Sequence, residues 1–228
     1  MADAPDWPKV LSLTVHEFRT PLTVVAGYLR MLSSNRVGEL TETQKRVIQE
    51  AEKSCARLSG LLTEVSEVAH FHQGRLSFLR SPVALAGVLE GVALTAAAER
   101  PMRIVREGRI DDAAVVNGDA ARLRQALSSV ATAVGREIIE GSSLFLITDI
   151  RPGAGGREAF LAFGSEATAR DMIAAPRESL SPFDTTRGGS GLSLVVARQV
   201  LEDHGAQMFG APGEHPSAGA GITLPLSS

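Results

Sequence analysis

The sequence has little of what marks several large classes of protein. Its 228 residues contain one cysteine, Cys55, so no internal disulfide can form, and a reducing cytoplasmic location is the simplest interpretation. Aromatic residues make up 4% and the net charge is −3, so a nucleic-acid-binding surface is not expected. No apolar run is long enough to span a bilayer, and the first ten residues do not resemble a signal peptide. We therefore expect a cytoplasmic globular chain with no nucleic-acid partner and no membrane segment.

Two long helices are predicted in the first part of the chain. The first covers about residues 8–34 and carries apolar residues at alternating spacings of four and three, a heptad seam. Pro21 lies inside it and predicts a kink. The second covers about residues 41–71 and begins with a capping-box pattern, Thr41-Glu42-Thr43-Gln44. The members of the seam are Leu11, Val15, Phe18, Leu22, Val25, Leu29 and Leu32.

A short loop between two such helices predicts an antiparallel hairpin. A lone hairpin leaves much of these wide apolar stripes uncovered, whereas a homodimer buries them in a four-helix bundle. The alternative is a single hairpin that packs against the rest of the chain. We favour the homodimer because the seam is unbroken.

The remainder of the chain mixes helix and strand patterns that do not alternate strictly, which is typical of an α+β sandwich. The division predicted is a helical hairpin over 1–75 and an α/β sandwich domain over 76–228. A His204-Gly205 pair is expected to end the last helix. The expected helices are 84–98, 119–139 and 191–204, and the expected strands are 77–81, 102–106, 143–150, 158–164, 207–210 and 221–226.

His16 is the candidate reactive residue of the first helix. It lies beside the seam, with Glu17 next to it and Thr20 one turn later on nearly the same face. A neutral imidazole is nucleophilic near pH 7, and a neighbouring carboxylate can accept its other proton. Such a histidine can carry a phosphoryl group, and Thr20 can orient a water toward an acyl phosphate. The alternative is a solvated histidine on a polar helix face.

The segment His16-Glu17-Phe18-Arg19-Thr20-Pro21-Leu22 resembles the phosphoacceptor box of sensor histidine kinases. The resemblance implies that His16 is the phosphoacceptor and Glu17 the assisting base, with Glu17 and Thr20 as a phosphatase pair. It extends over nearly the whole chain and implies an ATPase-like second domain. His70 and His72 have no third ligand nearby, so no metal site is expected.

The second domain departs from the family pattern where nucleotide binds. The family places two asparagines four residues apart on one helix, the latter holding the magnesium that bridges the phosphates. Here these positions are Ser129 and Ala133. Alanine offers no oxygen to hold the magnesium. Phosphoryl transfer depends on that ion, because it neutralises the negative charge of the phosphates.

The first glycine box of the family, with its adenine-binding aspartate, has two placements. Asp149–Gly153 keeps the acid but has Arg151 in place of a glycine, and 162–167 has no aspartate. We prefer the second placement, because the strands 143–150 and 158–164 are joined by a glycine-rich turn and are expected to form a hairpin, which the family places before the box. The second glycine box is kept at Gly189 and Gly191, where it forms either an anion cradle or a plain tight turn.

An intact phosphoacceptor with a degenerate nucleotide site predicts a histidine phosphotransferase. In this interpretation His16 exchanges a phosphoryl group with the aspartate of a response-regulator receiver domain, which also supplies the magnesium, and no cofactor binds this chain strongly. The first alternative is an ATP-dependent kinase that phosphorylates His16. The second is a non-catalytic scaffold that binds response regulators.

Overall fold

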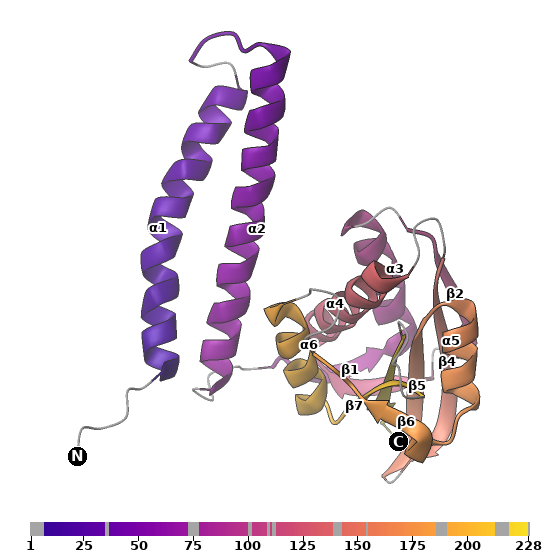
Figure 1. The fold of residues 1–228 in the computed structure, drawn as a ribbon. Helices are drawn as coiled ribbons and strands as arrows, with labels where there is room; N and C mark the ends of the chain where they lie inside the picture. The colour runs from indigo at the N-terminus through magenta and orange to yellow at the C-terminus, as the bar shows by residue number, and fades with distance from the viewer. Residues whose placement is uncertain are drawn as a thin grey trace, which may run out of the picture. The chain divides into compact units, whose positions relative to one another are not determined.

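The computed structural model divides the chain into two compact units, residues 1–77 and 78–228 (Figure 1). None of the helices in the described part combines the length and hydropathy that a bilayer-spanning segment needs. The residues that the structure describes are 7–34, 37–72, 78–99, 102–108, 110, 113–138, 143–153, 155–185, 191–212 and 219–227.

The first unit is the predicted helical hairpin, formed by α1 (Trp7–Ser33) and α2 (Glu42–His72). The predicted capping box starts α2, since the Thr41 N–H donates to Gln44 Oε1 at 2.9 Å and the Gln44 N–H donates to Thr41 Oγ1 at 3.3 Å. Helix α1 continues through Pro21. The proline therefore removes one backbone donor without ending the helix.

Some residues of the heptad seam are buried or partly buried in the hairpin and others are exposed to solvent. Val15 is 3% exposed, and Ile48, Cys55 and Ala69 of α2 are also buried, whereas Phe18 and Val25 are 59% and 47% exposed. The exposed apolar residues of α1 also include Val10, Leu13, Val24, Tyr28 and Met31. One face of the hairpin is therefore apolar and uncovered within a single chain.

The second unit is built on a six-stranded mixed sheet in the order β2-β4-β5-β8-β7-β6. A separate antiparallel pair joins β1 (Ser81–Ala84) to β3 (Val115–Gly118). The predicted hairpin of β4 and β5 is present, with Phe145 opposite Gly164. The remaining elements are α3 (Leu85–Glu99), β2 (Ile104–Gly108), α4 (Ala120–Glu137), β4 (Leu144–Gly153), β5 (Gly156–Gly164), α5 (Glu166–Ala174), η1 (Arg177–Ser179), β6 (Leu180–Pro182), α6 (Leu192–Asp203), β7 (Gln207–Pro212) and β8 (Gly219–Pro225).

Both faces of this sheet are covered by helices. The larger core joins one face to α3, α4 and α6 and contains Leu161 and Phe163 of β5. The alternate residues Phe160 and Ala162 point to the other face, where they are buried with Met172 of α5. The α+β class is confirmed, and the second unit has three layers (Figure 1).

The predicted strand at 77–81 is wrong. Residues 78–80 are not in a strand, and the strand begins at Ser81, where Val83 is buried opposite Val116 of β3. Four elements were not predicted: β3, α5, η1 and β6. For α5 a local signal was present, because the Ser165 hydroxyl accepts a hydrogen bond from the Thr168 N–H at 3.2 Å as an N-cap.

Candidate functional site

The predicted phosphoacceptor lies in the middle of α1 and points to solvent. The His16 and Glu17 side chains are 78% and 74% exposed, and His16 Nδ1 lies 4.0 Å from Glu17 Oε1. Thr20 follows one turn later and is also exposed. Because Val15 fixes the buried side of this turn, the helix presents His16 to an incoming partner.

The position of Glu17 distinguishes the two ring nitrogens of His16. Nδ1 is the nitrogen that faces the carboxylate, so a small side-chain rotation lets it donate its proton there. In that tautomer Nε2 keeps its lone pair and is the nucleophile. The arrangement is therefore suited to covalent chemistry at Nε2.

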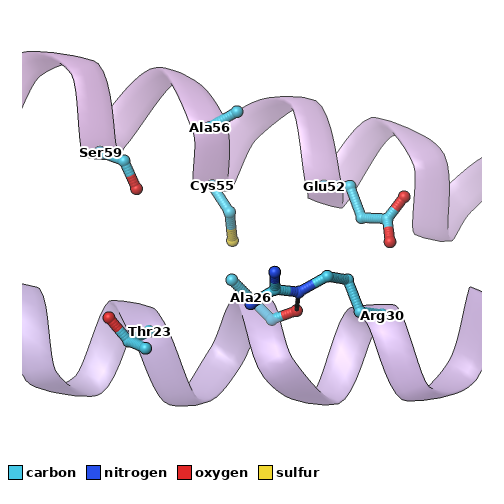
Figure 2. A pocket seen from close by; sticks show the side chains of 7 residues that line it. All are labelled: Thr23, Ala26, Arg30, Glu52, Cys55, Ala56 and Ser59. Atoms are coloured by element: carbon cyan, nitrogen blue, oxygen red, sulfur yellow. Dashed lines mark hydrogen bonds between the residues drawn. The ribbon is translucent and has the colours of Figure 1, made fainter.

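A groove of about 480 Å³ between α1 and α2 lies near this face (Figure 2). Thr23, seven residues after His16, is two turns further along nearly the same face of α1. The figure shows Cys55 and Glu52 of α2 facing Ala26 and Arg30 of α1. The groove is lined by Thr23, Ala26, Arg30, Glu52, Cys55, Ala56 and Ser59.

Of the two α4 positions where the family has asparagines, Ala133 is buried and Ser129 is partly exposed. Ala133 is 0% exposed and is part of the main core. The Ser129 hydroxyl donates to the Gln125 carbonyl of its own helix at 3.1 Å. Ala133 does not fit as a magnesium ligand, because it has no oxygen donor and its side chain is buried.

Neither placement of the first glycine box forms a nucleotide loop. Asp149 lies within β4, not after it, and its Oδ2 accepts a hydrogen bond from Arg151 Nε at 3.0 Å. In the preferred placement, the end of β5 leads through Ser165 directly into α5. Gly191 precedes α6 with a φ of +57°, a left-handed conformation that favours glycine, and Gly189 lies outside the described residues.

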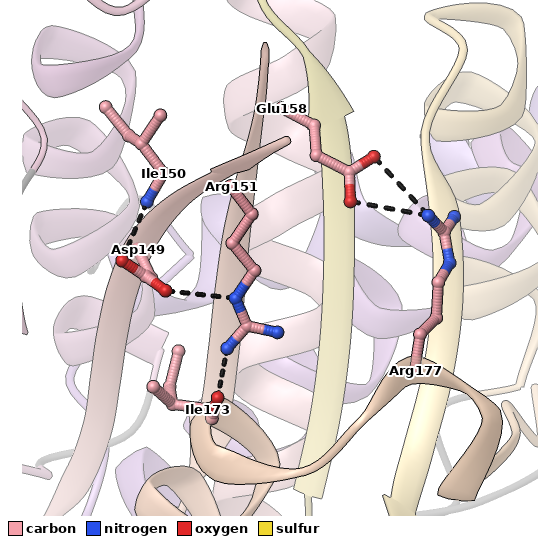
Figure 3. Close-up of polar contacts among 6 residues, drawn as sticks. All are labelled: Asp149, Ile150, Arg151, Glu158, Ile173 and Arg177. Atoms are coloured by element: carbon pink, nitrogen blue, oxygen red, sulfur yellow. Dashed lines mark hydrogen bonds and ion pairs between the residues drawn. The ribbon is translucent and has the colours of Figure 1, made fainter. Parts of the chain in front are cut away.

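Polar contacts join the segment after β5 to the face of the sheet that α5 covers, called the outer face below (Figure 3). Arg151 donates to the Ile173 carbonyl at the end of α5 and lies 4.4 Å from the Phe160 ring centre. Arg177 Nη1 lies 3.3 Å from Glu158 Oε1. The sequence reasoning did not single out Arg151 or Arg177 for this role, since their partners are distant in sequence.

Comparisons with known proteins agree with this architecture. A family model for the His Kinase A (phospho-acceptor) domain matches residues 9–74. The chain is 30% identical over 203 residues to the phosphate regulon sensor protein PhoR of Pseudomonas aeruginosa, covering 85% of this chain and 44% of PhoR. It is 25% identical over 221 residues to the sensor protein GacS of Pseudomonas syringae, covering 92% of this chain and 24% of GacS.

The fold is also found in a solved structure. Full-length ShkA, crystallised in complex with AMPPNP, superposes with a TM-score of 0.62 at 24% identity, covering 97% of this chain and 46% of ShkA. The chain thus spans less than half the length of PhoR, GacS and ShkA. With a phospho-acceptor hairpin followed by an ATPase-like unit, the chain belongs to the sensor histidine kinase family of two-component signalling proteins.

Proposed function

We propose that this chain is a histidine phosphotransferase, which exchanges a phosphoryl group between His16 and the aspartate of a response-regulator receiver domain. The observation that carries the proposal is a contrast between the two units. His16 is exposed beside Glu17, whereas Ala133, at the position of the family's magnesium ligand, is buried in the core. If the phosphoryl donor is a partner protein, and not ATP bound to this chain, both the exposed His16 and the buried Ala133 are accounted for.

In the exchange, the lone pair of His16 Nε2 attacks the phosphorus of the receiver's acyl phosphate. The bond from phosphorus to the aspartate oxygen breaks, and the aspartate leaves as a carboxylate. Glu17 takes the proton from Nδ1, so the phosphohistidine forms without a positive ring. The receiver supplies the magnesium that neutralises the phosphoryl oxygens, and Glu17 and Thr20 position water when the acyl phosphate is hydrolysed instead.

We infer that the receiver docks along the groove between α1 and α2. The groove begins near Thr23 on nearly the same face as His16, so a partner seated there reaches Nε2. Arg30 and Glu52 place one charge of each sign in the lining, which favours one orientation of the partner. We place this exchange in the cytoplasm, where the single thiol, Cys55, stays reduced.

We also propose that the hairpin dimerises through its uncovered apolar face. Phe18 and Val25 are members of the heptad seam yet are 59% and 47% exposed in one chain. Phe18→Glu should therefore convert the dimer to a monomer in size-exclusion chromatography with light scattering. Val37→Glu is the control, because Val37 is 65% exposed and lies outside both helices. A Phe18→Glu protein that stays dimeric would contradict this interface.

The decisive experiment compares two phosphoryl donors for the full chain. One reaction contains labelled ATP with magnesium, and the other contains a receiver phosphorylated with labelled phosphate. We expect label on the wild-type chain from the receiver alone, and none on His16→Ala from either donor. Label from ATP that is lost in His16→Ala would instead show an autophosphorylating kinase, the activity that the name of a relative, the signal transduction histidine-protein kinase BaeS of Escherichia coli, suggests. No label from either donor would indicate a receiver-binding scaffold.

A further inference from the structure

Residues 78–80, the entry segment of the second unit, contact three residues of this unit: Asp119, Asp203 and His204. The Leu79 N–H donates to Asp119 Oδ2 at 3.1 Å, and the Arg80 guanidinium donates to the Asp203 carbonyl. The Phe78 ring meets the imidazole of His204 edge to face, with ring centres 5.1 Å apart. These contacts join the segment after the hairpin to the start of α4 and the end of α6.

His204 lies at the centre of this cluster and is 3% exposed. It ends α6 as predicted, because the Gly205 and Ala206 N–H groups return to the Glu202 and Leu201 carbonyls at 2.9 Å. Its ring bridges two helix ends: Nδ1 lies 2.6 Å from the Val200 carbonyl, and Nε2 accepts the Asp119 N–H at 3.0 Å. A carbonyl on one side and an N–H on the other are satisfied together only by the neutral ring with its proton on Nδ1.

The charged groups around His204 determine which acceptor is available if the ring takes up a second proton. They are Asp119 and Arg122 at the start of α4, Asp203 of α6 and Arg80 of the entry segment. Burial works to raise the pKa of the Asp119 carboxyl. Hydrogen bonds from the backbone N–H groups of Arg122, Leu79 and Ala121, together with the Arg122 charge, outweigh it and hold that pKa below its usual range. The carboxylate beside His204 is therefore ionised at neutral pH.

We propose that His204, Asp119 and residues 78–80 form a proton-sensitive latch. A proton on Nε2 places two N–H groups face to face, because the Asp119 N–H already points at that nitrogen. The new N–H requires an acceptor, and the Asp119 carboxylate supplies it by giving up the Leu79 N–H. Proton uptake thus opens the latch and frees the entry segment, while Asp119 Oδ1 still caps α4. The inference stands apart from the chemistry at His16.

Amide hydrogen exchange by NMR tests the latch in the full-length chain. Between about pH 7.5 and about pH 5, a range in which imidazoles ordinarily titrate, the Leu79 and Asp119 amides should lose protection at least about tenfold more than the amides of β5, after correction for intrinsic rates. His204→Gln removes the imidazole and should abolish this difference. His70→Gln is the matched control, because it removes a partly exposed imidazole of α2 and should behave as wild type.

Two results would overturn the proposal: wild-type protection at Leu79 and Asp119 that does not change relative to β5, or the same loss in His204→Gln. If His204→Gln does not fold, the wild-type protein alone decides. The loss of protection must then follow the titration of the His204 ring signals, and a loss at a different pH refutes the latch.

Discussion

Restoring the family's asparagine at position 133 is the sharpest test of the burial of this position. In an open nucleotide cleft, Ala133→Asn would project into solvent and return a magnesium ligand. In this structure Ala133 is 0% exposed, between the equally buried Val130 and Val134. The larger amide has no room there, and we expect Ala133→Asn to destabilise the protein without restoring ATP binding.

The expected loss has two parts. Forcing extra atoms into a packed core costs about 1–3 kcal/mol, and an amide buried without partners costs about 1–3 kcal/mol more. Ala133→Asn should therefore lower the free energy of unfolding by about 2–6 kcal/mol. Ser129→Asn is the matched control on the same helix. Ser129 is partly exposed and loses only its hydrogen bond to Gln125, so its cost should stay below about 1 kcal/mol.

Urea unfolding followed by circular dichroism measures this loss. Trp7, the single tryptophan, lies in α1, so its fluorescence follows the hairpin separately from the second unit. Calorimetry with ATP and magnesium completes the assay. An Ala133→Asn protein that is as stable as wild type and binds ATP more tightly would refute the burial of position 133, and with it the main support for a phosphotransferase.

Three further predictions concern the stability of the second unit, measured by urea unfolding. Gly118→Ala should destabilise by about 1–3 kcal/mol, because a Cβ there would lie 2.6 Å from a ring carbon of a buried histidine, whereas Gly87→Ala in α3 meets open space and should stabilise by up to about 1 kcal/mol. The lowered pKa of Asp119 stabilises the fold above about pH 4, the unfolded value, and this contribution is lost as the pH falls through the folded value; Asp119→Asn should flatten that acid dependence. Arg177→Ala leaves a largely buried carboxylate unpaired and should cost about 1–3 kcal/mol, against less than about 1 kcal/mol for Arg170→Ala at an exposed pair.

Local patterns were enough to predict the first unit and much of the second. The heptad seam and the Thr41 capping box located α1 and α2, because helix periodicity and end signals are properties of short segments. The phosphoacceptor box placed His16 on a helix for the same reason, and its exposure follows from the burial of Val15 one residue before it. The hairpin of β4 and β5 was likewise predicted from two strand patterns and a glycine-rich turn.

Contacts between distant segments decided the rest. The sequence shows that position 133 is alanine, but only the packing of the main core shows that this position of α4 is buried. Helix α5 is short and weakly patterned, and it is stabilised by the outer face of the sheet and by Arg151, which no local signal encodes. The bond from Asp119 to His204 joins residues 85 positions apart. The sequence alone thus named His16 as the candidate phosphoacceptor, whereas only tertiary packing shows that Ala133 is buried, because burial depends on neighbours that only folding brings together.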